Sequence, residues 1–136
     1  MTTWIADTSV SVPMVVASHI AHELVNETVG ARDLCLTAHS ALETYSVLTR
    51  LPSDARLWPA DAALLIEDRF PAIIALGADE STVLVSELAR LAIAGGAVYD
   101  ALIAVTARSA GATLVTRDRR AEATYRKLGI AVELIG

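Results

Sequence analysis

The stretch that most constrains the fold is 98–118, VYDALIAVTARSAGATLVTRD. Its first half is apolar nearly all round and predicts a buried helix, which Gly111 ends. Residues 112–116 then predict a short buried strand, because they are β-branched or small and carry no charge. A helix that leads into a parallel strand runs antiparallel to it, so Asp100 and Asp118 should share one edge of the sheet. That edge is where open α/β sheets bind their ligands.

The rest of the chain repeats this alternation of strand and helix, which is typical of a parallel α/β sheet. We therefore expect one domain, 1–136, with an α/β fold: a three-layer α/β/α sandwich around a mostly parallel central sheet of four to five strands. The only clear linker is 51–59, which contains two prolines. Strands are predicted at 2–6, 34–37, 71–76, 112–116 and 130–135. Helices are predicted over 8–29 with a break at Pro13, 37–51, 60–70, 80–94, 98–109 and 119–128.

Helical periodicity also predicts which side chains are buried. Trp58 is expected to cover an edge of the core, and Cys35, the only cysteine, to behave as a small buried apolar residue. The predicted inward rows are Leu42, Tyr45 and Leu48 on one helix, and Val83, Leu84, Leu88 and Leu91 on another.

Charge and hydropathy narrow the possible functions. The net charge of −5 argues against general polyanion binding by the whole surface. The last third is nevertheless basic, which suggests either a local anionic ligand or simply a solvated helix face. No apolar run is long enough to span a membrane, so a cytoplasmic protein without a membrane partner is expected. The basic residues of this region are Arg108, Arg117, Arg119, Arg120, Arg126 and Lys127.

Two more acids, Asp7 and Glu43, are expected at the same edge of the sheet as Asp100 and Asp118. Each of them follows or lies near the end of a predicted parallel strand. Each has an ordinary explanation alone: Asp7 could cap a helix, and Glu43 could pair with Arg50. These separate explanations do not account for four acids at one edge, because two carboxylates about 5 Å apart repel by roughly 3 kcal/mol. A hard divalent cation with oxygen ligands, Mg²⁺ or in its place Mn²⁺, would relieve that repulsion.

At these residues the sequence resembles the PIN-domain ribonucleases, specifically the VapC-type toxins of bacterial toxin–antitoxin pairs. The resemblance rests on Asp7-Thr8-Ser9 after the first strand, Glu43 in ALETYSVLTRLP, Asp100 in YDALIAVTA, and Thr116-Arg117-Asp118 after LV. It covers nearly the whole chain. The sequence departs from many members at Arg119-Arg120, where an acid and an aromatic are common.

The resemblance implies a metal-dependent endoribonuclease that hydrolyses RNA phosphodiester bonds. Asp7, Asp100 and Asp118 would hold Mg²⁺, and Glu43 would orient the attacking water or help to bind a second ion. All four acids are therefore candidate catalytic residues. The candidates for contacts to substrate, or for aiming the carboxylates, are Ser9, Thr116, Arg117, Arg119 and Arg120.

Other classes fit less well. A haloacid-type phosphatase needs a second aspartate where Ser9 stands, and a receiver domain needs a lysine after a late strand, whereas Lys127 lies in a predicted helix. A catalytically idle PIN-fold binding or scaffolding module stays open as an alternative.

Partners follow from composition and from the resemblance. With 54% hydrophobic residues, this short chain has more apolar side chain than one small core readily hides. The excess falls in the helices predicted over 8–29, 37–51 and 60–70. The resemblance implies a homodimer and a groove for a cognate VapB-type antitoxin, which would also send a basic side chain toward the four acids.

Overall fold

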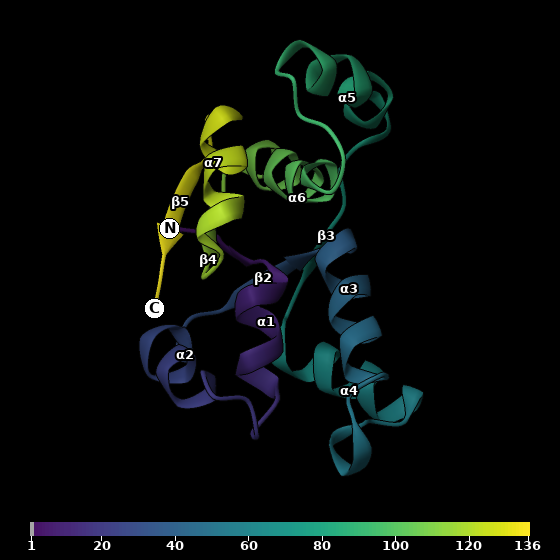
Figure 1. Cartoon of the computed structure of the whole chain (residues 1–136), viewed down its shortest axis with the longest axis vertical. Coiled ribbons are helices and arrows are strands. Elements are labelled where there is room, and N and C mark those ends of the chain that lie inside the picture. Colours follow the sequence, from purple (N-terminus) through teal and green to yellow (C-terminus); the bar gives the residue numbers. More distant parts are fainter. Residues whose placement is uncertain (1) are drawn as a thin grey trace.

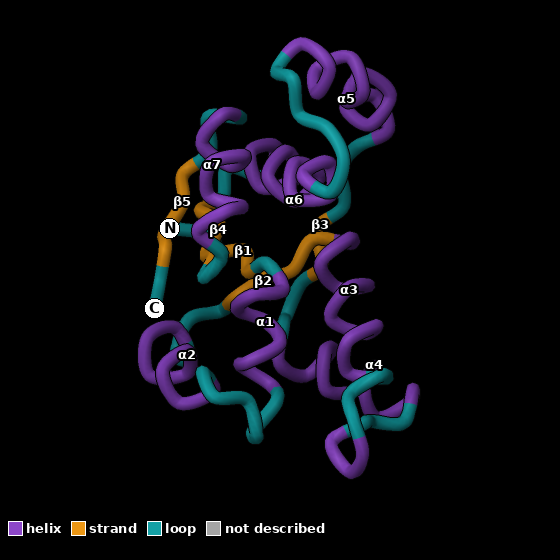
Figure 2. The backbone as a smooth tube through the Cα atoms, viewed as in Figure 1, coloured by secondary structure: helices purple, strands orange, loops and turns teal. Residues whose placement is uncertain are grey.

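The computed structural model describes residues 2–136 and contains a five-stranded sheet in the order β3-β2-β1-β4-β5 (Figure 2). Every neighbouring pair of strands is parallel, as predicted. The central strand β1 pairs through Ile5 with Cys35 on one side and Leu114 on the other. The strands are β1 (Trp4–Ala6), β2 (Leu34–Thr37), β3 (Ile73–Ile74), β4 (Thr113–Thr116) and β5 (Ala131–Leu134).

Helices cover both faces of the sheet, which gives the three-layer α/β/α sandwich (Figure 1). Ile5 belongs to the hydrophobic cluster under α5–α7, whereas Ala6 belongs to the cluster under α1–α4, because successive side chains of a strand point to opposite faces. The helices are α1 (Thr8–Val15), α2 (His22–Val29), α3 (Ala38–Leu48), α4 (Pro59–Arg69), α5 (Ala78–Arg90), α6 (Ala97–Ser109) and α7 (Arg119–Lys127), with a short 3₁₀ turn, η1 (Ser53–Ala55), before α4. Within residues 2–136, no helix combines the length and apolar character needed to cross a membrane.

The predicted break at Pro13 was wrong. Pro13 lies buried inside α1, and the chain leaves the helix only after Val15. A proline cannot donate to the carbonyl four residues earlier, so the Ser9 carbonyl loses its helical partner. The Arg117 guanidinium donates to that carbonyl instead, at 3.4 Å. A contact from a distant strand end therefore replaces the helical hydrogen bond that the proline removes.

The predicted buried row of α3 was also partly wrong. Leu42 is 70% exposed, while Ser40, Ala41, Thr44 and Leu48 face the core. The Thr44 hydroxyl lies 2.7 Å from the Ser11 hydroxyl of α1 and donates to the Ser40 carbonyl. Helix α3 therefore packs on α1 through small hydroxyl side chains, and this rotates Leu42 outward.

Three other burial predictions need correction. Val83 is exposed on α5, whose buried side chains are Leu84 and Leu88. Trp58 is 78% exposed at the start of α4 and does not cover the core. Cys35 is only partly buried, although it does pack against the core cluster. At each of these three positions, a prediction based on apolar character alone gave more burial than the structure shows.

Candidate active site

The four predicted acidic residues lie at the carboxyl edge of the sheet. Asp7 follows β1 and caps α1, and Asp118 lies two residues beyond β4 and caps α7. Asp100 is in the first turn of α6, and Glu43 lies in α3, which follows β2 directly. The strands that carry or precede Asp7, Asp118 and Glu43 are adjacent in the sheet, so the topology gathers residues that are far apart in sequence (Figure 1).

Asp7 is the most firmly held of the four. Its side chain is buried and accepts four hydrogen bonds. The Ser9 backbone N–H and hydroxyl donate to Oδ1, and the hydroxyls of Thr116 and Tyr125 donate to Oδ2. Burial raises the pKa of Asp7 above its ordinary value, although all four donors act in the opposite direction. Four donors fill all the lone-pair positions that a carboxylate offers, so the orientation of Asp7 is fixed.

Ser9 and Thr116 connect the first acid to the last. The Arg117 backbone N–H donates to the Ser9 hydroxyl at 2.8 Å, and the Asp118 N–H donates to the Thr116 hydroxyl at 3.0 Å. The structure therefore places these two hydroxyls, which were predicted to touch substrate or aim the carboxylates, behind the acids as supports for Asp7 and for the turn after β4.

Asp100 differs from Asp7, because it lies near other negative charges that disfavour its ionised form. Its pKa is raised to about 6, first by desolvation and then by the negative charges of Asp118, Asp7 and Glu43. The nearby His39 acts in the opposite direction. These contributions agree with the topology, which brings Asp7, Glu43 and Asp118 within electrostatic reach of Asp100.

The acids fit a hard divalent cation in donor type and in charge, since Mg²⁺ takes carboxylate oxygens and relieves such repulsion. Their positions do not yet form a ligand set: among residues 2–136, no three Asp, Glu, His or Cys side chains are placed to hold one ion together. Asp7 in particular would reach an ion directly only if one of its four donors gave way, or else through an intervening water.

Two residues of the site were not predicted from the sequence. Tyr125 is completely buried on α7, and its hydroxyl lies 2.8 Å from Asp7 Oδ2. The available signal was its position four residues after Ala121 on the apolar side of the last helix, where a phenol needs a hydrogen-bond partner. Burial and the charge of Asp7 raise the pKa of Tyr125, so the phenol stays protonated as a donor.

His39 is the second residue that was missed. Its Nε2 lies 3.4 Å from Glu43 Oε1, so Glu43 faces a histidine of its own helix rather than Arg50. The imidazole stacks on the Tyr99 ring with the centroids 5.4 Å apart and the planes 9° from parallel. Spacing of four residues between His39 and Glu43 was the signal for this pair.

The basic residues near the site divide into two groups. Arg117 is half-buried and holds the Ser9 carbonyl, so it supports the fold. Arg119 and Arg120 are exposed in the first turn of α7, and Arg120 lies 3.7 Å from Asp118. Arg108 and Arg126 are engaged with Glu87 and Glu122, respectively. Arg119 and Arg120, which directly follow Asp118, therefore combine exposure with a place beside an acid of the site.

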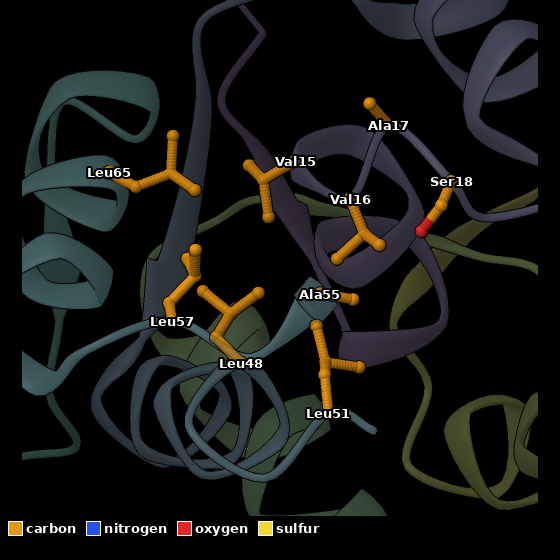
Figure 3. Close-up of a pocket in the computed structure, with 9 residues that line it drawn as sticks. All are labelled: Val15, Val16, Ala17, Ser18, Leu48, Leu51, Ala55, Leu57 and Leu65. Carbon is orange, nitrogen blue, oxygen red and sulfur yellow. The ribbon is translucent and has the colours of Figure 1, made fainter. Parts of the chain in front are cut away.

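An apolar groove of about 260 Å³ lies near the other end of α1. Figure 3 shows its side chains, which come from the end of α1 and the turn after it, the end of α3, the segment that leads into α4, and α4 itself. Most of these residues belong to the three segments in which the sequence showed an excess of apolar residues, while Ala55 and Leu57 come from the linker before α4. The groove is lined by Val15, Val16, Ala17, Ser18, Leu48, Leu51, Ala55, Leu57 and Leu65.

Comparison with known proteins agrees with this fold. Residues 5–127 match the model of the PIN domain. The chain is 48% identical over 126 residues to ribonuclease VapC27 of Mycobacterium tuberculosis, covering 93% of this chain and 92% of that protein. It is 45% identical over 130 residues to ribonuclease VapC40 of the same organism, covering 95% and 96%.

Solved structures show the same fold. The crystal structure of Mycobacterium tuberculosis VapC20, described as a sarcin–ricin loop cleaving toxin, aligns with a TM-score of 0.71 at 19% identity and covers 95% of this chain and 97% of that one. DNA-bound VapBC from Salmonella typhimurium aligns with a TM-score of 0.67 at 22% identity, covering 98% of each chain. The chain therefore belongs to the PIN-domain family. Within that family it falls in the VapC-type group that its two sequence relatives represent.

Proposed function

We propose that this protein is a metal-dependent endoribonuclease that acts as the toxin of a VapBC-type toxin–antitoxin pair. The observation that carries the proposal is the placement of Asp7, Glu43, Asp100 and Asp118 at one carboxyl edge of the sheet, where the charges of the other three acids help to raise the pKa of Asp100. Such a cluster is costly for stability, and perturbed carboxyl groups of this kind concentrate at functional sites. The relatives at 45–48% identity are named ribonucleases, which supports RNA as the substrate.

Asp7, Asp100 and Asp118 are the proposed holders of the cation, Mg²⁺ or in its place Mn²⁺. When bound, such an ion offsets negative charge on the scissile phosphate and makes water a better nucleophile at neutral pH. Asp7 contributes a fixed orientation, because four donors hold its carboxylate. Glu43 is half-exposed beside His39 and is the proposed acceptor that orients the attacking water.

Arg119 and Arg120 are the proposed contacts to RNA phosphates outside the carboxylate cluster. They are exposed at the start of α7, directly after Asp118. Ser9, Thr116 and Arg117 act behind the site, through the hydrogen bonds that join β4 to α1.

The apolar groove supports a second part of the proposal, a cognate VapB-type antitoxin. It lies at the end of α1 opposite Asp7, and an eight-residue helix spans about 12 Å. An extended segment of about four residues covers that distance. One antitoxin tail can therefore place apolar side chains in the groove and a basic one beside the acids. A homodimer in the cytoplasm completes the proposal, with the exposed apolar side chains as its interface.

A cleavage assay with purified protein and bacterial RNA tests the enzyme proposal. We expect cleavage with Mg²⁺, none with EDTA, and none in Asp100→Asn, whose far-UV circular dichroism spectrum should match that of the unmodified protein. Sequencing the new 5′ ends would identify the RNA and the cut site. Cleavage that survives EDTA or Asp100→Asn would contradict the proposed site. A protein that binds RNA without ever cutting it would favour the idle binding module.

A further inference from the structure

Tyr99 is an exposed aromatic residue beside the acidic cluster. It directly precedes Asp100 in the first turn of α6, and it is 57% exposed. Its ring stacks on the nearly parallel imidazole of His39, at 5.4 Å between centroids. Since more than half of the residue is open to solvent, Tyr99 keeps aromatic surface exposed beside this stack.

The partner beneath the ring belongs to the same site. His39 lies in the first turn of α3, and its Nε2 is 3.4 Å from Glu43 Oε1. The two stacked rings therefore join the helix that carries Glu43 to the helix that carries Asp100. A flat group placed on the exposed part of the Tyr99 ring would lie near Asp100, the next residue, and near Glu43, which faces His39.

The electrostatics of this edge indicate what kind of contact could hold RNA there. The chain has a net charge of −5, and four acids meet beside Tyr99, so phosphate contacts alone are unfavourable at this position. Stacking of a base on an aromatic ring needs no positive charge and tolerates any base, since every base has a π-face. Recognition of unpaired RNA commonly uses such stacking.

We propose that Tyr99, supported from below by His39, is a stacking site for one unpaired nucleobase of the RNA, next to the bond that is cut. This inference rests on the proposed ribonuclease function, because it takes RNA as the ligand. It assigns to Tyr99 a binding role that is separate from the acids.

Binding of single-stranded RNA octamers tests the inference. The probes are 5′-labelled octa-adenylate, octa-uridylate and a matched octamer that lacks bases at its central positions. Fluorescence anisotropy gives the Kd in buffer containing Ca²⁺, and a denaturing gel verifies that the probe stays intact. We expect Tyr99→Leu to bind both intact probes about 5- to 100-fold more weakly, the range for loss of one base–aromatic stack.

Three comparisons make the test specific. Tyr99→Phe keeps the ring and should bind as the unmodified protein does. Tyr99→Leu should leave the salt dependence of log Kd unchanged, because no phosphate contact is lost. The octamer without central bases should bind equally to both proteins. Trp58→Leu is the matched control, since it removes another exposed aromatic residue, at the start of α4, which carries none of the four acids, and its Kd should not change.

Several results would overturn the inference. These are equal Kd values for Tyr99→Leu and the unmodified protein, an equal loss in Tyr99→Phe, or no binding of either intact probe. Light scattering that shows a dimer becoming a monomer in Tyr99→Leu, with RNA affinity unchanged, would assign the ring to a protein interface instead. Failure of the proposed function is distinguished by the cleavage assay on the unmodified protein, which does not depend on Tyr99.

Discussion

Asp100→Asn should make the protein more stable at pH 8 while it abolishes the proposed cleavage. The pKa of Asp100 is about 6 in the folded protein, against an ordinary value of 3.8. At about 1.4 kcal/mol per pH unit, this shift corresponds to about 3 kcal/mol of destabilisation by the ionised carboxylate. Asp100 is only half-buried, so solvent screening reduces the expected gain on its removal to about 1–2 kcal/mol.

The sign of the pH dependence follows from proton binding. Between pH 4 and pH 6 the folded state holds a proton on Asp100 that the unfolded chain has already lost, so stability falls as the pH rises. The penalty is absent below about pH 4 and complete above about pH 7. The difference between Asp100→Asn and the unmodified protein should therefore grow across this window and then level off.

Thermal unfolding followed by circular dichroism, without divalent cations, measures this difference. For a chain of this length, 1–2 kcal/mol corresponds to about 3–7 °C in Tm. Asp68→Asn on exposed α4 is the matched control and should change Tm little at any pH. Adding Mg²⁺ at pH 8 should raise the Tm of the unmodified protein more than that of Asp100→Asn. An Asp100→Asn protein that is less stable at pH 8, or a difference independent of pH, would refute the electrostatic reasoning.

Three further predictions concern the supports and surfaces of the site. Tyr125→Phe removes a buried donor to Asp7 and should lower the free energy of unfolding by about 1.5–3 kcal/mol in urea titrations; an unchanged value would show that this hydrogen bond is not important. Reversing Arg119 and Arg120 to Glu should weaken RNA binding and flatten its salt dependence, whereas an unchanged salt slope would mean that RNA approaches from elsewhere. Leu57→Glu puts a charge in the apolar groove and should weaken binding of the co-expressed antitoxin without affecting RNA cleavage by the isolated toxin; intact copurification would place the antitoxin on another surface.

The sheet and the convergence of the acids could be predicted because both depend on topology. Parallel strands linked by helices must present their carboxyl ends at one edge, so the position of Asp100 in its helix and of Asp118 after its strand was sufficient. The number and direction of strands were confirmed for the same reason. The assignment of the chain to VapC-type proteins was confirmed by its relatives. The roles of individual site residues stay predictions until variants are measured.

What the sequence did not reveal were contacts between side chains that are distant along the chain. Arg117 donates to the Ser9 carbonyl that Pro13 leaves without a helical partner, and no residue near Pro13 in the sequence indicates this contact. The hydroxyl pair of Ser11 and Thr44 likewise decides which face of α3 is buried, although the pattern of leucines favoured another. Polar pairs of this kind have no periodicity, so a reading based on apolar spacing places the helix correctly and its rotation incorrectly.

Asp7 and Asp100 differ in how their carboxylates are stabilised. Hydrogen bonds hold Asp7 rigidly, whereas nearby negative charges disfavour the ionised form of Asp100. Asp7 has four donors and so gains little from any new partner, whereas no hydrogen bond within residues 2–136 reaches the Asp100 carboxylate. A positively charged group that enters this edge therefore stabilises Asp100 much more than Asp7. A cation and a basic side chain of an antitoxin would satisfy the same carboxylate, so the two should compete. The expected consequence is that Mg²⁺ weakens antitoxin binding to the unmodified protein and has much less effect on its binding to Asp100→Asn, which calorimetric titration of both proteins can measure.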